Sequence, residues 1–322
     1  MNVQTVDKTG IKGSDTFPIN VSDYYKAVET LAYQGIEAVK SANPIENAFY
    51  DYPVDGNGRV IEEAIIEMAK AKAFVPTAEG AQPDLSPLDP KLHVKYFNNY
   101  EKKQYKVTVR DEELDKVLLK GMSPEAFATK IVDTLTQGEA FEDFKTEASF
   151  FAKANFVDAK TAIGGAPLNM KGVLYAIREM ASVIHATNKE GGVPCEMAVD
   201  LADIRIAIPS DVKSLIDYTE LANTFNMSVE EMKGHIVELP VHGAVTWPDS
   251  GTCIYVYDVH RLGRAIKKRK FVSDTISLQE YRNMGLNVDK GYLVNELAKG
   301  LYLDISNAIT TAKGTIIGNA GK

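Results

Sequence analysis

The chain has 322 residues, of which 45% are hydrophobic, and it carries a formal net charge of −8 at pH 7. This apolar content, together with 15 tyrosines and 12 phenylalanines, can fill a core and excludes an intrinsically disordered protein. The acidic balance argues against a protein whose main surface grips nucleic acid. The opening residues, MNVQTVDKTG, lack the apolar segment of a secretory signal, and no window approaches about 18 unbroken apolar residues. We therefore expect a soluble protein made in the cytosol.

The N-terminal region predicts an arm followed by a short helix. Residues 1–20 are polar and dotted with glycine, without a hydrophobic period, which indicates an extended segment. Such an arm is either a frayed terminus or a strap that crosses onto another subunit, and composition favours neither. Ser22 then begins a predicted short helix with one apolar face, which ends at Asn43-Pro44.

The next region predicts a projecting ribbon. Helical spacing of apolar residues over 60–74 predicts a helix, and residues 76–90 follow with four prolines and no apolar period. Alternation of charged and apolar residues then predicts two strands, at 92–96 and 105–109, paired as a hairpin around two asparagines. Because an isolated hairpin is barely stable in water, we expect this ribbon to need a neighbour.

The longest predicted element is a helix over residues 123–154. Ser123 is a good N-cap, and Pro124 suits the first helical position. The apolar residues recur at helical spacing with a phase slip near Gly138: Phe127, Ile131, Leu135, Phe141, Phe144, Ala148 and Phe151. We interpret this aromatic series as core, so the helix should lie on another layer of the protein.

The remaining chain predicts a compact α/β module. A helix is expected at 168–186, and the Gly191-Gly192-Val193-Pro194 break after it marks a domain boundary. The elements expected next are a strand at 204–208, a helix at 211–224, a capped helical turn at 228–231, and strands at 236–239 and 253–257. Residues 267–317 predict turns mixed with short strands.

The sequence carries no recognisable catalytic, nucleotide or metal motif. GxGxxG, a Walker lysine, HExxH and GxSxG are all absent. Cys195 and Cys253 lack metal-binding spacing and are interpreted as inert buried thiols of a reducing compartment. The five histidines are scattered, and the basic run at 267–270 is interpreted as a solvated or interface segment. We therefore predict no catalytic, cofactor or metal residue and favour a protein that is not an enzyme.

Two stretches carry a resemblance to a known family. SPLDPKLHVKYFNNYEKKQYKVTVRDEELDKVL, leading into ATKIVDTLTQGEAFEDFK, resembles the extended loop, its return strand and the start of the spine helix in major capsid proteins of tailed bacteriophages. IRIAIPSDVKSLIDYTELANTFNMSVEEMKGHIVELP resembles the central axial module of the same proteins. The order of elements from about residue 54 to the end also resembles the Hong Kong 97-type fold, which capsid proteins share with encapsulins.

The resemblance implies an α+β, Hong Kong 97-type capsid fold with an N-terminal arm, an extended β-hairpin loop, a peripheral domain with a long spine helix and an axial α/β domain. Residues 1–53 would be the arm and short helix, and 54–112 the extended loop region with its hairpin. Residues 113–200 would form the peripheral domain, with the spine helix at 123–154. Residues 201–322 would form the axial domain with returning strands of the peripheral domain.

The resemblance also implies subunit-interface residues in place of an active site. The candidates, on the extended loop and on an axial loop at 242–251, are Pro76, Pro83, Leu85, Pro87, Leu88, Pro90, Tyr96, Tyr105, Arg110, Trp247 and Asp249. Some relatives cross-link subunits through a lysine and an asparagine. Lys91, Lys95, Lys102 and Lys103 lie in the corresponding region, but no reactive pair aligns.

The implied function is that of a structural shell protein, which self-assembles into the icosahedral or prolate capsid that encloses the double-stranded DNA of a tailed phage. Its partners would be other copies of itself in pentamers and hexamers, with a portal and a scaffolding protein. It would enclose DNA without sequence-specific binding, would need no cofactor or membrane, and would reside in the virion after assembly in the host cytoplasm. Two alternatives stay open: an encapsulin-type compartment around protein cargo, and a soluble cytosolic enzyme without a recognisable motif.

Overall fold

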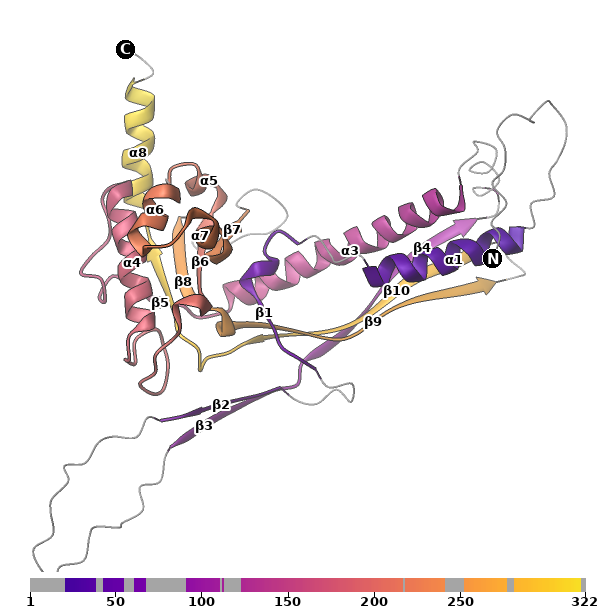
Figure 1. Ribbon diagram of the computed structural model, residues 1–322, viewed down its shortest axis with the longest axis horizontal. Helices are drawn as coiled ribbons and strands as arrows, with labels where there is room; N and C mark the ends of the chain where they lie inside the picture. Colours follow the sequence, from indigo (N-terminus) through magenta and orange to yellow (C-terminus); the bar gives the residue numbers. More distant parts are fainter. Residues whose placement is uncertain are drawn as a thin grey trace, which may run out of the picture. The chain divides into compact units, whose positions relative to one another are not determined.

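The computed structural model of the chain contains two compact units and is shown in Figure 1. The residues that it describes are 21–38, 43–54, 61–67, 91–110, 112, 123–216, 218–240, 252–276 and 281–319. Unit 1 comprises residues 1–40, 105–136 and 270–286, and unit 2 comprises residues 41–104, 137–269 and 287–322. Four long elements contribute residues to both units: β4 (Tyr100–Arg110), α3 (Pro124–Ala152), β9 (Leu262–Ile276) and β10 (Tyr281–Val294).

Unit 1 contains the predicted N-terminal helix, which is α1 (Val21–Ala38). Gly35 of α1 lies against Val132 of α3, so closely that a Cβ at Gly35 would come within 3.2 Å of the valine side chain. An ion pair of 3.7 Å joins Glu29 of α1 to Arg282 of β10. Helix α1 is therefore held by both close packing and charge.

Unit 2 is built on a five-stranded mixed sheet. Its strand order is β5 (Val157–Asp158), β11 (Gly300–Asp304), β8 (Cys253–Asp258), β6 (Ile204–Pro209) and β7 (Ile236–Leu239). The outer pairs, β5 with β11 and β6 with β7, are parallel, and the inner pairs are antiparallel. All six residues of β8 are buried, because the sheet is covered on both faces.

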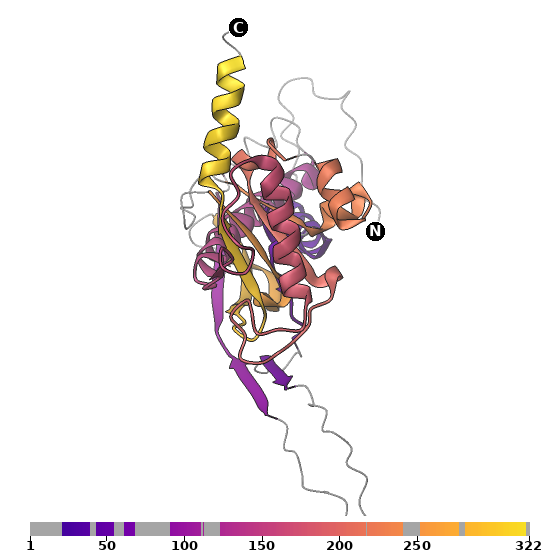
Figure 2. The ribbon, with the colours of Figure 1, turned by 90° about the vertical axis from the view of Figure 1, so that its left-hand side faces the viewer.

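One face of this sheet carries helices. Ile254 and Val256 of β8 point into a core that is shared with α4 (Met170–His185). Figure 2 shows α4 lying in front of the strands. The helices α6 (Tyr218–Phe225), α7 (Val229–His235) and α8 (Ser306–Asn319) complete this side. The predicted helix at 168–186 is thus confirmed.

The other face of the sheet packs against the end of α3. Tyr255 and Tyr257 of β8 point into a second core, which contains Ala148 and Phe151 of α3. The short segment of η1 (Glu46–Ala48) joins the same core. The alternation of β8 side chains between the two cores explains why residues 253–257 (CIYVY) are all apolar.

A second, four-stranded sheet has the order β1 (Tyr50–Asp51), β9, β10, β4. β1 runs parallel to β9, with Tyr50 opposite Gly263. A side chain at Gly263 would overlap the ring of Tyr52 and the side chain of Leu293, so glycine is required by this close approach.

The long helix is confirmed, but its buried face differs from the prediction. The hydroxyl of Ser123 accepts a hydrogen bond from the amide of Ala126 at 3.3 Å, and the helix continues unbroken through Gly138. There is no phase slip, because the buried stripe continues through three carboxylates (Glu139, Asp143 and Glu147) instead of moving to aromatic residues. The prediction of Phe141 as core is wrong, since 48% of it is exposed.

The predicted helix at 60–74 is wrong over the residues that the structure describes. Residues Ile61–Ile66 form strand β2, which pairs antiparallel with β3 (Leu92–Phe97). Ile61 and Ile65 are four residues apart, a spacing that fits one face of a helix and also one face of a strand. The strands at 92–96 and 105–109 are confirmed, but their hairpin is wrong, because β3 pairs with β2 and β4 pairs with β10.

The predictions for the C-terminal half are partly correct. The strands β6, β7 and β8 are confirmed, and α7 begins with the expected capping box of Ser228 and Glu231. The helix predicted at 211–224 is two helices, α5 (Ser210–Lys213) and α6, because the amides of Leu215 and Ile216 bond back only three residues. The tail contains the short strand β11 and a turn before it, as predicted, but the 15-residue β9, the 14-residue β10 and helix α8 were not predicted.

Candidate functional site

The ribbon formed by β2 and β3 (residues 61–66 and 92–97) is fastened to the rest of unit 2 at one end. Ile61 and Phe97, which face each other across the ribbon, pack against the cluster of Tyr52, Ala265 and Leu293. Lys95 forms an ion pair with Glu296, and both side chains are exposed to solvent. Within the ribbon no described side chain is fully buried.

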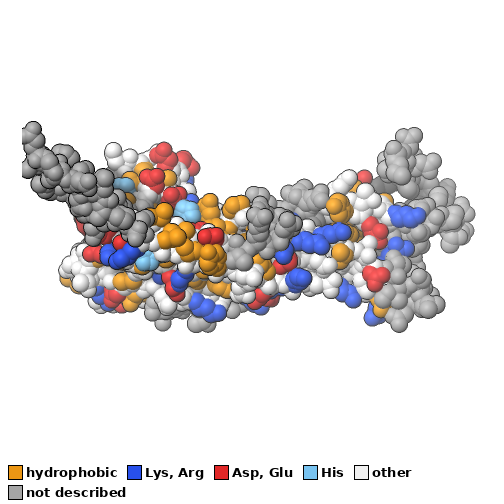
Figure 3. Space-filling model, turned by 90° about the horizontal axis from the view of Figure 1, so that it is seen from below, with side chains coloured by type: hydrophobic (Ala, Val, Ile, Leu, Met, Phe, Trp, Pro, Cys, Tyr) orange, Lys and Arg blue, Asp and Glu red, His pale blue; other side chains and the backbone are white. Residues whose placement is uncertain are grey.

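One face of the ribbon is mostly apolar and exposed. Strand alternation and the register place Ala64, Ile66, Leu92, Val94 and Tyr96 on this face, together with one charged residue, Glu62, which lies opposite Tyr96. Ile66, Leu92 and Tyr96 are 61%, 58% and 66% exposed, respectively. Figure 3 shows hydrophobic side chains gathered on the side of the molecule seen from below. We call the exposed face that these side chains of β2 and β3 form the ribbon face.

Most of the predicted interface residues lie outside the described residues. This holds for Pro76, Pro83, Leu85, Pro87, Leu88, Pro90, Trp247 and Asp249. Tyr96 lies on the ribbon face. Tyr105 is half-buried on β4, and Arg110 is exposed at the end of the same strand. These assignments as interface residues stay predictions.

Two of the four lysines considered for cross-linking are engaged within unit 2. Lys95 pairs with Glu296, and the Nζ of Lys103 donates to the hydroxyl of Thr146 on α3 at 3.0 Å. Lys91 and Lys102 are exposed on the surface.

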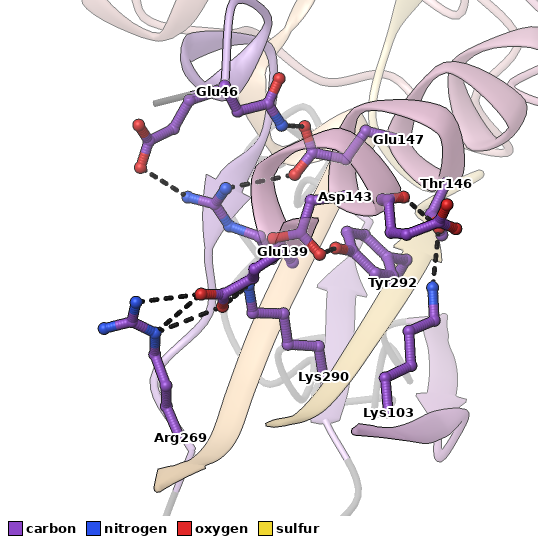
Figure 4. A network of polar contacts seen from close by, with 12 residues as sticks. Glu46, Lys103, Glu139, Asp143, Thr146, Glu147, Arg269, Lys290 and Tyr292 are labelled. Atoms are coloured by element: carbon purple, nitrogen blue, oxygen red, sulfur yellow. Dashed lines mark hydrogen bonds and ion pairs between the residues drawn. The ribbon is translucent and has the colours of Figure 1, made fainter. Parts of the chain in front are cut away.

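A row of three buried carboxylates on α3 forms the main polar site of unit 2. Glu139, Asp143 and Glu147 recur every four residues and are 0%, 3% and 0% exposed. They face β9 and β10, as Figure 4 shows. Three cations on those strands, Arg264, Arg269 and Lys290, pair with them. We call these six residues the ion cluster.

Two of these carboxylates share one lysine. The Nζ of Lys290 lies 2.6 Å from a carboxylate oxygen of Glu139 and also donates to Asp143. The hydroxyl of Tyr292 donates to the other oxygen of Asp143 at 2.9 Å. Arg269 also binds Glu139, because the Nε of Arg269 donates to the Oε2 of Glu139 at 3.0 Å.

The third carboxylate, Glu147, helps to fix the segment at residues 43–51. Arg264 donates to Glu147 at 3.2 Å, to Glu46 at 3.3 Å and to Asp51 at 2.7 Å, so one guanidinium serves three carboxylates. The side-chain amide of Asn43 also donates to Glu147, at 2.5 Å. Burial, which Arg264 offsets only in part, raises the pKa of Glu147 to about 7. The cluster thus ties residues 43–51 to α3 and β9.

Two further buried cations hold the C-terminal ends of helices. Arg261 donates to the carbonyl oxygens of Ala154 and Asn155, just beyond α3, and to that of Ala298. Lys299 donates to the carbonyl oxygens of Ile184 and Ala186 at the end of α4. Burial lowers the pKa of Arg261 to about 10 and that of Lys299 to about 8. Cations in these positions satisfy carbonyl groups that a helix end leaves without partners.

The sequence reasoning missed this ion cluster. The signal was present, because Glu139, Asp143 and Glu147 repeat at four-residue spacing in line with Leu135 and Phe151.

Among the described residues, no group of three or more His, Cys, Asp or Glu side chains could hold a metal ion. Cys195 and Cys253 are both buried free thiols, as predicted. No helix in the described part of the chain is long and apolar enough to cross a membrane.

The chain matches a known family, and its fold is similar to solved structures. A family model described as Phi29-like phage major capsid protein matches residues 6–299. The structure is similar to the capsid of Staphylococcus phage Andhra, with a TM-score of 0.55 and 10% identity over 83% of this chain and 85% of that chain. It is also similar to the mature capsid of bacteriophage PhiM1, with a TM-score of 0.50 and 10% identity over 84% and 89% of the two chains. No curated protein matches the sequence.

A third similar structure is the capsid of an empty GTA particle, with a TM-score of 0.51 and 11% identity over 83% of this chain and 91% of that chain. At such low identities these likenesses concern the fold alone. They confirm the expected mixed α and β class of the Hong Kong 97 type.

Proposed function

This chain belongs to the Phi29-like phage major capsid protein family, and from that membership we propose that its copies close a shell by laying the ribbon face of one copy on the next. The protein is a shell-forming structural component of a phage virion. An encapsulin-type compartment is not favoured, because the matching family consists of phage capsid proteins.

The observation that carries the proposal is the exposed ribbon face. Three large apolar side chains, Ile66, Leu92 and Tyr96, are each more than half exposed on one side of a two-stranded ribbon. A ribbon of two strands is marginal in water unless something packs on it. Contiguous apolar surface of this kind marks an interaction site. For a shell protein the partner present in excess is another copy of the same chain.

The attachment of one end of the ribbon suits this role. The ion pair of Lys95 with Glu296 and the packing of Ile61 and Phe97 hold one end on unit 2. The apolar face beyond that end then reaches a neighbour without disturbing the fold of its own copy. Burial of each large apolar side chain contributes about 1.5–3 kcal/mol, so contacts repeated around a shell sum to a large stabilisation.

Family membership and this contact together lead to a fuller proposal for the shell and its partners. Copies form pentamers and hexamers of an icosahedral or prolate shell around double-stranded DNA, with a portal and a scaffolding protein, in the host cytoplasm. The protein acts structurally and without catalysis. Its regions are the arm and short helix at 1–53, the extended loop at 54–112, the peripheral domain at 113–200, and the axial domain with returning strands at 201–322.

Substitution on the ribbon tests the docking step. The variant Ile66→Asp/Leu92→Asp places two charges on the ribbon face, and the control Ile66→Leu/Leu92→Ile keeps it apolar. Both variants should have wild-type circular dichroism and thermal unfolding, because neither side chain is buried in the single copy. Sedimentation velocity should find shells or capsomers for the wild type and the control, and only smaller species for the charged variant. Wild-type assembly by the charged variant would contradict the proposal.

A further inference from the structure

We propose that Lys290 and Asp143 become joined by an isopeptide bond that fixes helix α3 to strand β10 within one copy of the chain. The Nζ of Lys290 is hydrogen-bonded to Asp143 and lies 2.6 Å from Glu139. The hydroxyl of Tyr292 donates to the second oxygen of Asp143 at 2.9 Å. A nucleophile, an electrophilic carboxyl group, a second carboxylate and a hydrogen-bond donor therefore converge on one centre (Figure 4).

The site is dry. Lys290 is 6% exposed, Asp143 3% and Glu139 0%. In water an ammonium and a carboxylate are stabilised by hydration, which opposes their condensation to an amide. In the protein interior that hydration is lost, and a buried ion pair is often no more stable than neutral groups of similar size. Condensation replaces two buried charges with one neutral amide.

Besides burial, the reaction needs the reacting groups to be close together, and the geometry provides this. Reacting groups held in the correct orientation reach effective molarities of about 10⁵–10⁸ M. Glu139 is itself held in place, because the Nη2 of Arg269 lies 2.9 Å from its carboxylate. After the bond has formed, Glu139 keeps Arg269 and Glu147 keeps Arg264 as partners, so the reaction leaves no cluster charge unpaired.

The reaction balances without any further reactant. A proton passes from the ammonium of Lys290 to the carboxylate of Asp143, which gives an amine and a carboxylic acid. The lone pair of Nζ attacks Cγ of Asp143, while Tyr292 stabilises the negative charge that develops on the carbonyl oxygen. Glu139 carries a proton from Nζ to the departing hydroxyl group. One C–N bond forms, one C–O bond breaks and one water molecule leaves.

The same structure contains internal controls. Lys95 with Glu296 and Lys213 with Glu238 are also in hydrogen-bond contact. The side chains of these pairs are 37% and 58%, and 43% and 42% exposed. Because water reaches them, they should remain ordinary ion pairs.

Mass spectrometry of the denatured full-length protein tests the proposal. The wild type should be lighter than its sequence by one water molecule, and its tryptic digest should contain a branched peptide that joins the segments of Asp143 and Lys290. Lys290→Arg should have the full mass, and Asp143→Asn should lose ammonia in place of water. The control Lys95→Arg should keep the wild-type loss. If a variant does not fold, the wild-type branched peptide alone decides the question.

One side reaction gives the same mass change and must be separated. The sequence Asp55-Gly56 can close to a cyclic imide with loss of water, but the imide hydrolyses at alkaline pH and links no second peptide. A wild-type protein of full mass would overturn the proposal. So would a loss of water that survives Lys290→Arg, or one that maps to any other residue. The test concerns a single copy, so its outcome does not depend on docking of the ribbon.

Discussion

Removal of the Arg264 guanidinium is the most informative perturbation of the ion cluster outside the proposed covalent bond. Arg264 pairs with Glu147 on α3 and with Glu46 and Asp51 on the segment at 43–51. The Arg264 side chain is only 6% exposed. The variant Arg264→Met keeps an apolar stem of similar length and removes all three ion pairs. Glu147, at 0% exposed, then keeps the neutral amide of Asn43 but loses its cation.

The size of the effect follows from this burial. Breaking a buried ion pair from one side costs about 3–5 kcal/mol, because the remaining charge stays desolvated. Glu147 can reduce that cost by taking up a proton, since its pKa is already about 7. The exposed Glu46 and Asp51 add little. We therefore expect Arg264→Met to lower the free energy of unfolding by about 3 kcal/mol at pH 8.

Urea unfolding of unassembled protein, followed by circular dichroism, measures this change. The matched control is Lys145→Met, which breaks the exposed pair of Lys145 and Glu142 on the same helix and should cost below about 0.5 kcal/mol. In Arg264→Met/Glu147→Met both charges are gone, and most of the lost stability should return. A loss below about 1 kcal/mol in the single variant, or simple additivity in the double variant, would refute the reasoning.

Three further predictions follow from the same structure. Because the folded pKa of Glu147 lies above its ordinary value of 4.5, the stability that it contributes is present at low pH and lost as the pH rises through about 7. In urea titrations the free energy of unfolding of the wild type, relative to that of Glu147→Gln, should therefore fall by about 2 kcal/mol between pH 5 and pH 8. Parallel pH profiles of the two proteins would contradict this prediction. Lys299→Met leaves the end carbonyls of α4 without a donor and should cost about 3 kcal/mol in the same assay, whereas a neutral effect would show that these hydrogen bonds do not stabilise the fold. Ser228→Ala removes one half of the α7 capping box and should cost about 1 kcal/mol, with a change below about 0.3 kcal/mol counting against the cap.

Sequence reasoning predicted elements that carry their own local signals. Helix α3 follows from the Ser123 cap and the long helical period, and α7 follows from its capping box. The apolar run at 253–257 also predicted strand β8. Each of these features depends on neighbours in the sequence, which is why composition and spacing were sufficient.

Features that depend on distant partners were not predictable in the same way. The carboxylates of α3 are buried because Arg264 and Lys290 meet them from strands more than a hundred residues further along the chain. Without those partners, charged residues at four-residue spacing indicate a solvated helix face. Ile61 and Ile65 fit either period, and only the pairing of β2 with β3 decides between them.

The candidate interface shows the same limit. Alternation predicted the strand that carries Tyr96, and the resemblance to capsid proteins pointed to that region. The ribbon face could not be predicted, because half of it comes from β2, for which a helix was expected. A surface formed by two strands becomes visible only when their register is known.

The central claim is that this chain is a shell-forming capsid protein. Electron microscopy of the protein, combined with light scattering, tests it most directly when the protein is expressed alone and with the scaffolding protein proposed above. Closed shells or rings of capsomer size are the expected result. A protein that remains a monomer at every concentration, with and without the scaffolding protein, would contradict it.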